Sequence, residues 1–202
     1  MKRKVISMNK KIYDDLINNR IRFYSYDNDI KNENYNLNDS MILSGSFNPL
    51  HEGHIKLLQA SSNEFKKNPL FEISITNVDK SKINYNDLIN RINQFKSLGK
   101  LVVTNSSKFE EKSNIFKKSI FVVGYDTALR LVDNKYYKEG FQKSLKIIEK
   151  NNCSFLVSGR FINKKYNKPN NINFEGYDYL FDILSEEKFR LDISSTELRR
   201  LS

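Results

Sequence analysis

The chain has 202 residues, enough to bury about 70% of its unfolded surface around one core, so a second domain is not required. Its 34 Lys and Arg residues exceed its 24 Asp and Glu residues, but no nucleic-acid-binding motif accompanies the net charge of +10. We therefore expect an anionic small-molecule partner rather than nucleic acid. No apolar run approaches the roughly 20 residues of a membrane span and no signal peptide is recognised, which predicts a cytoplasmic protein. These features leave the oligomeric state open.

The first 39 residues match no motif and are predicted to form an extension ahead of a domain over residues 40–202. Apolar residues recur at helical spacing between Lys10 and Ile21, which predicts a short helix. Residues 27–40 are rich in Asn and Asp and are predicted to be a loop or linker.

Both histidines of the chain lie in the ten-residue segment from Gly45 to His54. A short apolar strand is predicted directly before this segment, over residues 41–43, and an amphipathic helix directly after it, over residues 55–65. The helix N-terminus would offer free N–H groups and a positive dipole end, and the imidazoles of His51 and His54 would add further donors. The segment therefore suits a nucleotide phosphate.

Two other interpretations of the histidine pair explain less of the segment. A zinc site needs three or four protein ligands, but no third histidine exists and Cys153 belongs to another predicted element, where it is expected to be buried. The histidines could instead be structural side chains with their hydrogen bonds made inside the fold, beside a tight turn. A tight turn would explain Gly45 or Gly53, but not the complete segment from Gly45 to His54.

After this segment, apolar runs of strand length alternate with stripes of helical spacing. The expected strands cover residues 70–76, 101–104, 120–123 and 155–157, and the expected helices cover 85–95, a segment through 128–132, and 177–184. This alternation predicts an α/β fold, a three-layer α/β/α sandwich with a mainly parallel sheet. In such sheets the ligand binds beyond the carboxyl ends of the strands, which is where the loop at Gly45 falls.

A second polar motif lies near the end of the chain. Ser194 and Glu197 have the spacing of a capping box, which predicts the start of a last helix. That start would present the hydroxyls of Ser194, Ser195 and Thr196 at the positive end of the helix dipole. Arg199, one turn further on, could bind a phosphate through two parallel hydrogen bonds.

Taken together, the two motifs resemble the signatures of the nucleotidylyltransferase superfamily. They are Gly45-Ser46-Phe47-Asn48-Pro49 followed by His51-x-Gly53-His54, and Ile193-Ser194-Ser195-Thr196-Glu197-Leu198-Arg199. The resemblance runs from about Ser40 to the end of the chain and implies a Rossmann-like fold in which both motifs converge on one triphosphate. It is closest to the nicotinamide and nicotinate nucleotide adenylyltransferases, including their plant and fungal relatives.

The resemblance implies that a phosphate oxygen of the acceptor attacks the α-phosphorus of ATP and that pyrophosphate leaves. No protein nucleophile is needed, and the catalytic roles fall to His51, His54 and Arg199, with Mg²⁺ carried in by the triphosphate. Gly45, Ser46, Phe47, Asn48 and the hydroxyls at 194–196 would bind the nucleotide. The histidines are expected to titrate between about pH 5 and 8.

Further nucleotide contacts are implied on the remaining segments. Lys80 or Lys82, after the second strand, resembles a phosphate-binding lysine of the superfamily, although either is equally explained as a surface charge. Gly124 and Asp126 resemble a Gly-x-Asp motif whose carboxylate binds a ribose hydroxyl, although Asp126 is also explained as a helix cap.

The acceptor side resembles the adenylyltransferases least, because the chain has no Trp on which a pyridine ring could stack. Tyr136 or Tyr137 is a candidate aromatic replacement, although a tyrosine pair that packs on its own helix is the default interpretation. The loop over residues 104–112 is a further candidate for contact with the acceptor. The leading hypothesis is the synthesis of a dinucleotide from nicotinamide or nicotinate mononucleotide in NAD biosynthesis. One alternative is the same fold with another acceptor, such as phosphopantetheine, or with CTP and a phosphorylated alcohol as substrates. The other alternative is a nucleotide-binding regulator with weak turnover.

Overall fold

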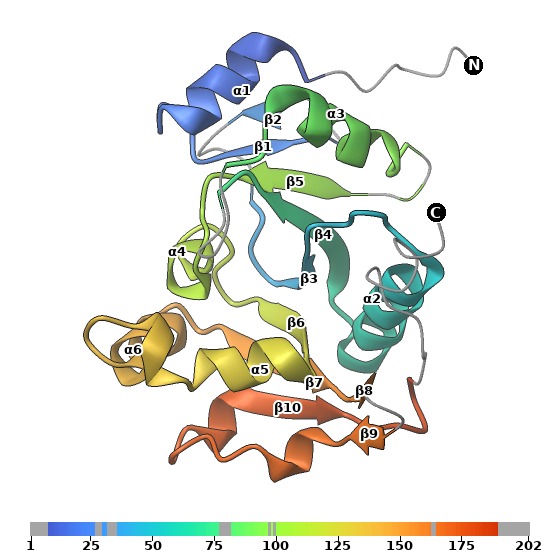
Figure 1. Cartoon of the computed structure of the whole chain (residues 1–202), viewed down its shortest axis with the longest axis vertical. Coiled ribbons are helices and arrows are strands. Elements are labelled where there is room, and N and C mark those ends of the chain that lie inside the picture. The colour runs from blue at the N-terminus through green and yellow to red at the C-terminus, as the bar shows by residue number, and fades with distance from the viewer. Residues whose placement is uncertain are drawn as a thin grey trace.

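The central feature of the chain is a twisted sheet of eight strands among the residues that the structure describes (Figure 1). This structure is a computed structural model that describes residues 8–26, 30–31, 36–76, 82–96, 98, 100–162 and 165–189. The strand order is β10-β7-β6-β3-β4-β5-β1-β2, and the first six strands in this order run parallel. These six are β3 (Ser40–Ser44), β4 (Asn68–Ser74), β5 (Leu101–Thr104), β6 (Ile120–Gly124), β7 (Ser154–Ser158) and β10 (Phe181–Leu184). β1 (Phe23–Ser25) joins β5 and β2 (Ile30–Lys31) joins β1, both antiparallel, while β8 (Arg160–Ile162) and β9 (Lys165–Asn167) form a separate hairpin.

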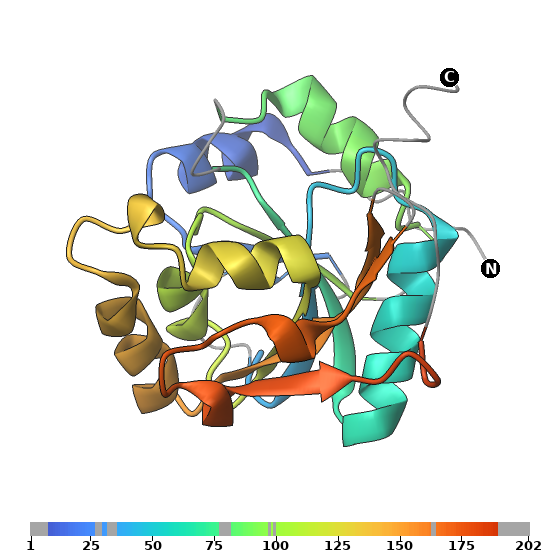
Figure 2. The same cartoon turned by 60° about the horizontal axis from the view of Figure 1, so that its bottom comes forward.

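Helices cover both faces of the sheet, so that α2 and α5 lie on opposite sides of it (Figure 2). The helices are α1 (Lys10–Ile17), α2 (Glu52–Phe65) and α3 (Tyr85–Asn93) on one face, and α4 (Phe109–Ser113), α5 (Tyr125–Leu131) and α6 (Phe141–Lys150) on the other. Three short 3-10 turns, at Asn134–Tyr136, Pro169–Asn171 and Asp178–Leu180, complete the described elements. The structure therefore confirms the predicted α/β/α sandwich with a mainly parallel sheet.

The two cores follow from the alternation of side chains along the central strands. On β3, Met41 and Leu43 face the core under α1, α2 and α3, whereas Ile42 faces the opposite core. Both faces are covered, so the strand is apolar at every one of these positions, as expected for a parallel sheet. Cys153, which precedes β7, is 2% exposed, as predicted.

Strands were found wherever they were predicted, with shifts of two residues at the ends of β4. The helix after the histidines begins at Glu52 rather than Ile55, so that His51 is its N-cap. α6 has no counterpart among the predicted helices. None of the described helices is both long and apolar enough to cross a membrane.

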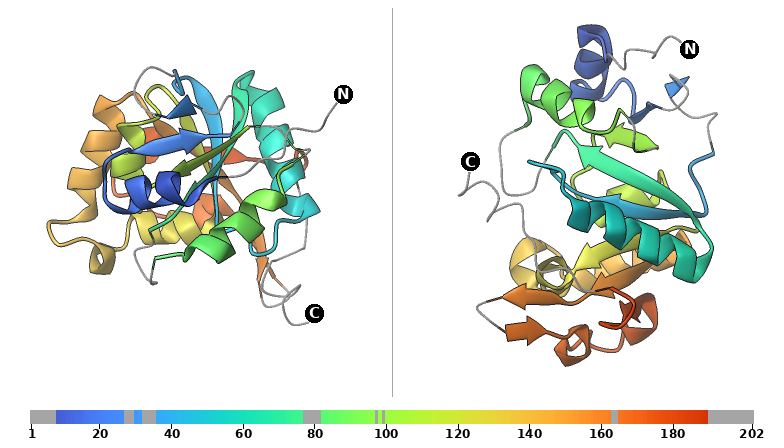
Figure 3. Two further views of the ribbon diagram at one scale, coloured as in Figure 1. Left: turned by 90° about the horizontal axis from the view of Figure 1, so that it is seen from above. Right: turned by 90° about the vertical axis from the view of Figure 1, so that its right-hand side faces the viewer.

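The N-terminal residues contribute to the sheet and to its core (Figure 3). Ile12 and Leu16 of α1 are buried with the residues of α2 and α3, and β1 extends the sheet beyond β5. The helix ends four residues earlier than predicted, because Asn18 caps it and Asn19 takes a left-handed conformation with φ of 57°. The strand β1 was not predicted.

The predicted helix over residues 177–184 is wrong. A 3-10 turn at Asp178–Leu180 leads into β10, which pairs in parallel with β7 at the edge of the sheet. The ring of Phe181 stacks on Phe155 at 5.0 Å and on Phe174 at 3.9 Å. The apolar residues of this segment fit both helical and strand spacing, and the open edge of β7 decides between them.

Candidate active site

The chain reverses its direction across the sheet at β3. From β3 it proceeds to β4 and β5 on one side, and it then returns to add β6, β7 and β10 on the other. Ligands of such sheets bind at this switch point, beyond the carboxyl ends of the two central strands. Here the loop at Gly45 follows β3 and Gly124 ends β6, and the pairing of Leu43 with Val122 brings both ends to the same edge. The structure thus brings two of the predicted nucleotide-binding segments together.

A buried phenylalanine anchors the loop that follows β3. Phe47 is 1% exposed, and its ring meets the rings of Phe71 at 5.6 Å and Phe95 at 5.2 Å. A Cβ atom at Gly45 would lie 2.8 Å from the Phe47 ring, so only glycine fits there. The Phe47 side chain therefore packs in the core, and only its main chain can serve the nucleotide-binding role that the motif implies.

Side chains from the end of α3 hold the backbone of the same loop. The side-chain amide of Gln94 accepts a hydrogen bond from Leu50 N–H at 2.8 Å and donates one to Phe47 O at 2.9 Å. The Arg91 guanidinium donates to Ser46 O at 3.2 Å. Neither residue was predicted from the sequence, because nothing local to α3 indicates that it faces a loop more than 40 residues earlier in the chain.

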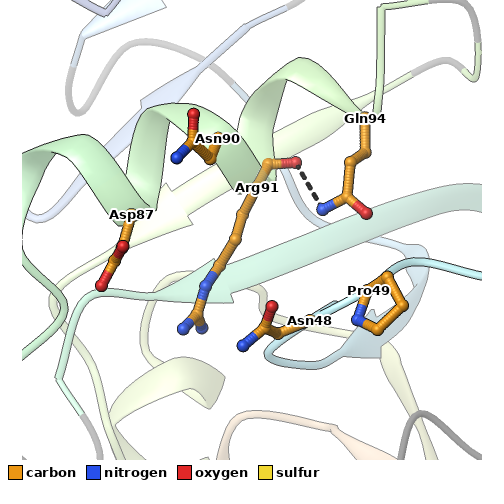
Figure 4. A pocket seen from close by; sticks show the side chains of 6 residues that line it. All are labelled: Asn48, Pro49, Asp87, Asn90, Arg91 and Gln94. Carbon is orange, nitrogen blue, oxygen red and sulfur yellow. Dashed lines mark hydrogen bonds between the residues drawn. The ribbon is translucent and has the colours of Figure 1, made fainter. Parts of the chain in front are cut away.

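A pocket of about 290 Å³ opens between this loop and α3 (Figure 4). It is lined by Pro49 and by the polar or charged residues Asn48, Asp87, Asn90, Arg91 and Gln94. The Arg91 side chain reaches from α3 toward the loop, while Gln94 also donates to Arg91 O at 3.2 Å. Asn48, predicted to bind nucleotide, thus lies on the wall of a pocket beside the switch point.

The two histidines form one unit at the start of α2. Their rings stack with centroids 3.8 Å apart, and the Phe47 ring meets His54 edge-on at 5.0 Å. His54 Nδ1 accepts a hydrogen bond from His51 N–H at 3.3 Å, and His54 N–H donates to His51 O at 3.0 Å. Because Nδ1 is an acceptor, neutral His54 carries its proton on Nε2. That N–H is the group that His54 can offer to an anion.

Burial, together with a smaller effect of the neighbouring His51, lowers the pKa of His54 from 6.5 to about 4. His54 is therefore neutral at pH 7, and the expectation that it titrates between pH 5 and 8 is wrong for the free protein. A proton on Nδ1 would also break its hydrogen bond with His51 N–H. The structure supplies a neutral N–H donor at this position rather than a positive charge.

Gly124 marks open space at the end of β6. A Cβ atom built on it would meet nothing within 4 Å, and its φ of −80° is one that any residue adopts. Neither crowding nor backbone conformation requires glycine here. It is the N-cap of α5, and Asp126 lies in the first turn of that helix, where a carboxylate complements the helix dipole.

Several predicted residues lie outside the described part of the chain. They are Lys80 and the C-terminal motif residues Ser194, Ser195, Thr196 and Arg199. The expected convergence of the two motifs therefore stays a prediction. Lys82 is described and exposed.

The two tyrosines proposed for the acceptor belong to another part of the molecule. Tyr137 is half-buried, and burial raises its pKa. It lines a pocket of about 230 Å³ with residues of α4, α6 and the segment before α6, and no residue of the histidine loop lines that pocket. The ring of Tyr136 lies under Lys135 Nζ at 4.9 Å from its centroid. This placement gives no support to stacking by either tyrosine next to His54.

The segment from Thr104 to Lys112 carries a buried ion pair. Lys112 Nζ lies 2.7 Å from Oε2 of Glu72, and these side chains are 7% and 0% exposed. The Thr104 hydroxyl donates to the other carboxylate oxygen at 2.6 Å. The pair joins α4, β4 and β5, so Lys112 is occupied within the fold and is not a contact for an acceptor.

Within the described ranges, no three His, Cys, Asp or Glu side chains gather as ligands of a metal ion. The donor that the site offers to a ligand is the Nε2–H of His54. Such a group suits phosphate oxygens, which accept hydrogen bonds from imidazole N–H groups.

Comparison with known families agrees with this chemistry. The family model described as cytidylyltransferase-like matches residues 42–201, which include the histidine loop, the Gly124 segment and the C-terminal motif. No curated protein matches the chain.

Proposed function

Because the chain belongs to the cytidylyltransferase-like family, we propose that it transfers AMP from ATP to a phosphorylated acceptor and releases pyrophosphate. The observation that carries this proposal is the histidine pair at the N-terminus of α2, held at the switch point with an Nε2–H donor on His54. Nucleotidyl transfer places negative charge on phosphate oxygens, and fixed donors at that place stabilise it.

In the proposed mechanism the residues of this chain bind, orient and stabilise, while the acceptor itself is the nucleophile. An oxygen of its phosphate forms a bond to the α-phosphorus, and the bond from that phosphorus to the bridging oxygen of pyrophosphate breaks. Neutral His54 donates from Nε2 to the phosphate oxygens that gain charge, and His51 stacks on it and keeps its ring in place. Mg²⁺ enters as part of the MgATP substrate.

The C-terminal motif completes the proposed triphosphate site. The hydroxyls of Ser194, Ser195 and Thr196 would bind phosphate at a helix start, and Arg199 would bind the outer phosphates. Asp126 would bind a ribose hydroxyl, and Lys80 a phosphate. These roles derive from the resemblance of the motifs.

The acceptor that we propose is nicotinamide or nicotinate mononucleotide, which would make this a cytoplasmic enzyme of NAD biosynthesis. The similarity of the two motifs to those of the mononucleotide adenylyltransferases supports this choice, whereas the positions of Tyr136 and Tyr137 do not. A second candidate is the transfer of CMP from CTP to a phosphorylated alcohol, which the description of the matching family favours. The Ser194-Ser195-Thr196 string favours adenylyl transfer over this alternative.

Pyrophosphate release distinguishes the candidates. The purified protein is incubated with MgATP or MgCTP together with one acceptor at a time. The acceptors are nicotinamide mononucleotide, nicotinate mononucleotide, phosphopantetheine and phosphocholine. We expect release with MgATP and a mononucleotide, and formation of the matching dinucleotide. Release only with MgCTP and phosphocholine would replace the first candidate by the second. Release with no pair would refute the proposed activity toward these acceptors.

Substitution of Gly124 tests whether the open space at the end of β6 receives the nucleotide. Gly124→Ala should raise the KM for ATP about tenfold or more, equivalent to about 1.4 kcal/mol, because the added Cβ would occupy space that the ligand needs. Gly124→Ser carries the same Cβ but a better N-cap side chain, so it should keep the stability of the fold. We expect both variants to lose affinity equally, although only Gly124→Ala loses stability, by about 1 kcal/mol. Unchanged KM values in both would place the nucleotide elsewhere.

A further inference from the structure

The loop between β3 and α2 has polar backbone groups that no regular element satisfies. Gln94 pairs two of them with one side chain, because its amide oxygen accepts from Leu50 N–H at 2.8 Å and its amide nitrogen donates to Phe47 O at 2.9 Å. A side-chain amide carries a donor and an acceptor side by side, so one Gln can satisfy both backbone groups.

The helix α3, whose C-cap is Gln94, is itself held in place by the core. Leu88 and Ile92 of α3 are 0% and 1% exposed in the core, and Asn84 caps the start of the helix by accepting a hydrogen bond from Asp87 N–H. The next residue after Gln94 is Phe95, whose ring is 2% exposed and meets the ring of Phe47. Residues 94 and 95 therefore hold the loop by its backbone and by its anchoring side chain.

The position of this contact connects it to the histidines. Leu50, whose N–H is bound by Gln94, directly precedes His51, which is the N-cap of α2 and the donor to His54 Nδ1. A shift of the backbone at Leu50 would thus move both imidazoles together. Misplacement of reacting groups by about 1 Å can lower a rate on the order of 10²-fold.

We propose that Gln94 is a positioning residue of the active site, which holds the segment from Phe47 to Leu50 and thereby sets the place of the two histidines. This rests on the proposed function, because the histidines matter only if nucleotidyl transfer occurs there. Gln94 would act through the loop and would not touch the nucleotide, so its loss should affect kcat more than KM for ATP.

Three variants separate this role from a general effect on folding. Gln94→Met keeps the length of the side chain and removes both hydrogen bonds. Gln94→Glu keeps an acceptor for Leu50 N–H but has no donor for Phe47 O at neutral pH. The matched control is Asn86→Leu, because Asn86 is an exposed residue of the same helix that does not line the pocket beside the loop.

Two measurements are made on the full-length protein. Steady-state kinetics with MgATP and nicotinamide mononucleotide, or the acceptor on which the pyrophosphate assay shows turnover, should give a kcat for Gln94→Met that is tenfold or more below the parent. The KM for ATP should change less than threefold. Amide hydrogen exchange followed by NMR should show protection of Leu50 N–H falling at least tenfold in Gln94→Met but not in Gln94→Glu or Asn86→Leu. Asn86→Leu should keep the parental kcat.

Each result decides the proposal. An unchanged kcat in Gln94→Met, or an unchanged exchange rate at Leu50, would overturn it. A fall in kcat of the same size in Asn86→Leu would also overturn it, because the effect would then not come from the hydrogen bonds. If the parent protein shows no turnover with any substrate pair, the proposed function fails, and exchange at Leu50 still decides whether Gln94 holds the loop.

Discussion

Replacement of His54 by alanine should lower kcat by about 10²–10³-fold, as for the loss of one preorganised donor to a developing charge. The reason is geometric, because the Nε2–H of His54 is fixed by the acceptor role of its Nδ1 and by stacking on His51. The effect on KM for ATP should be smaller. Initial rates measured against MgATP at a saturating acceptor concentration give both constants, and a far-UV spectrum confirms that the variant is folded.

A neighbouring substitution provides the control for this experiment. Glu52 lies in the same turn of α2, but its side chain is 60% exposed, and among the described residues its ion pair is with Lys56 at 3.4 Å. Glu52→Gln should therefore change kcat less than about twofold. If His54→Ala and Glu52→Gln have equal rates, His54 does not stabilise the transition state.

The pH dependence provides a separate check of the same residue. The lowered pKa of His54, about 4, predicts that its contribution to kcat/KM is constant between about pH 6 and 8 and is lost only as the pH falls toward 4. The same shift affects stability. An unfolded chain binds a proton at His54 below about pH 6.5, whereas the folded protein does so only near pH 4. The contribution of His54 to the free energy of unfolding is therefore complete above about pH 6.5 and decreases as the pH falls toward 4, by at most about 3 kcal/mol.

Urea unfolding at pH 7 and pH 5 measures this contribution. The parent should lose more stability between the two pH values than His54→Ala, because the variant has no such group to titrate. An equal loss in both proteins would contradict the assigned pKa.

Lys112→Ala should destabilise the protein by about 3–5 kcal/mol, because it leaves the carboxylate of Glu72 buried without its counter-ion. Glu72 is 0% exposed and its only other described side-chain partner is the hydroxyl of Thr104. The measurement is the midpoint and slope of urea unfolding at pH 7.

Two further variants show whether the unpaired charge is the cause. Lys112→Met combined with Glu72→Gln removes both charges and keeps an acceptor for the Thr104 hydroxyl, so it should recover most of the lost stability. Lys56→Ala breaks the exposed pair with Glu52 and should cost less than about 1 kcal/mol. If Lys112→Ala costs no more than Lys56→Ala, the buried pair contributes nothing.

The sequence by itself determined the elements whose patterns are local. The apolar run at Met41–Leu43, the glycine and proline loop, and the amphipathic stretch after His54 predict a strand, a turn and a helix in that order, and the structure has them. The alternation of such units also predicts a parallel sheet, because strands separated by helices are joined by right-handed crossovers. In such sheets ligands bind beyond the carboxyl ends of the strands. The sequence alone therefore predicts that the histidine loop lies at the carboxyl edge of the sheet, and in the structure it follows β3 at that edge.

Only the tertiary structure decided which elements face one another. Periodicity tells which side of α3 is buried, but it does not tell that Gln94 meets the backbone of a loop far earlier in the chain. In the same way, Lys112 belongs in sequence to a plausible acceptor loop, yet packing places it against Glu72 in the interior. The segment at Phe181 could form either a helix or a strand, and the free edge of β7 made it a strand. Hydrophobic patterns encode the burial of a side chain, whereas its partner and the resulting pKa depend on contacts between residues distant in sequence.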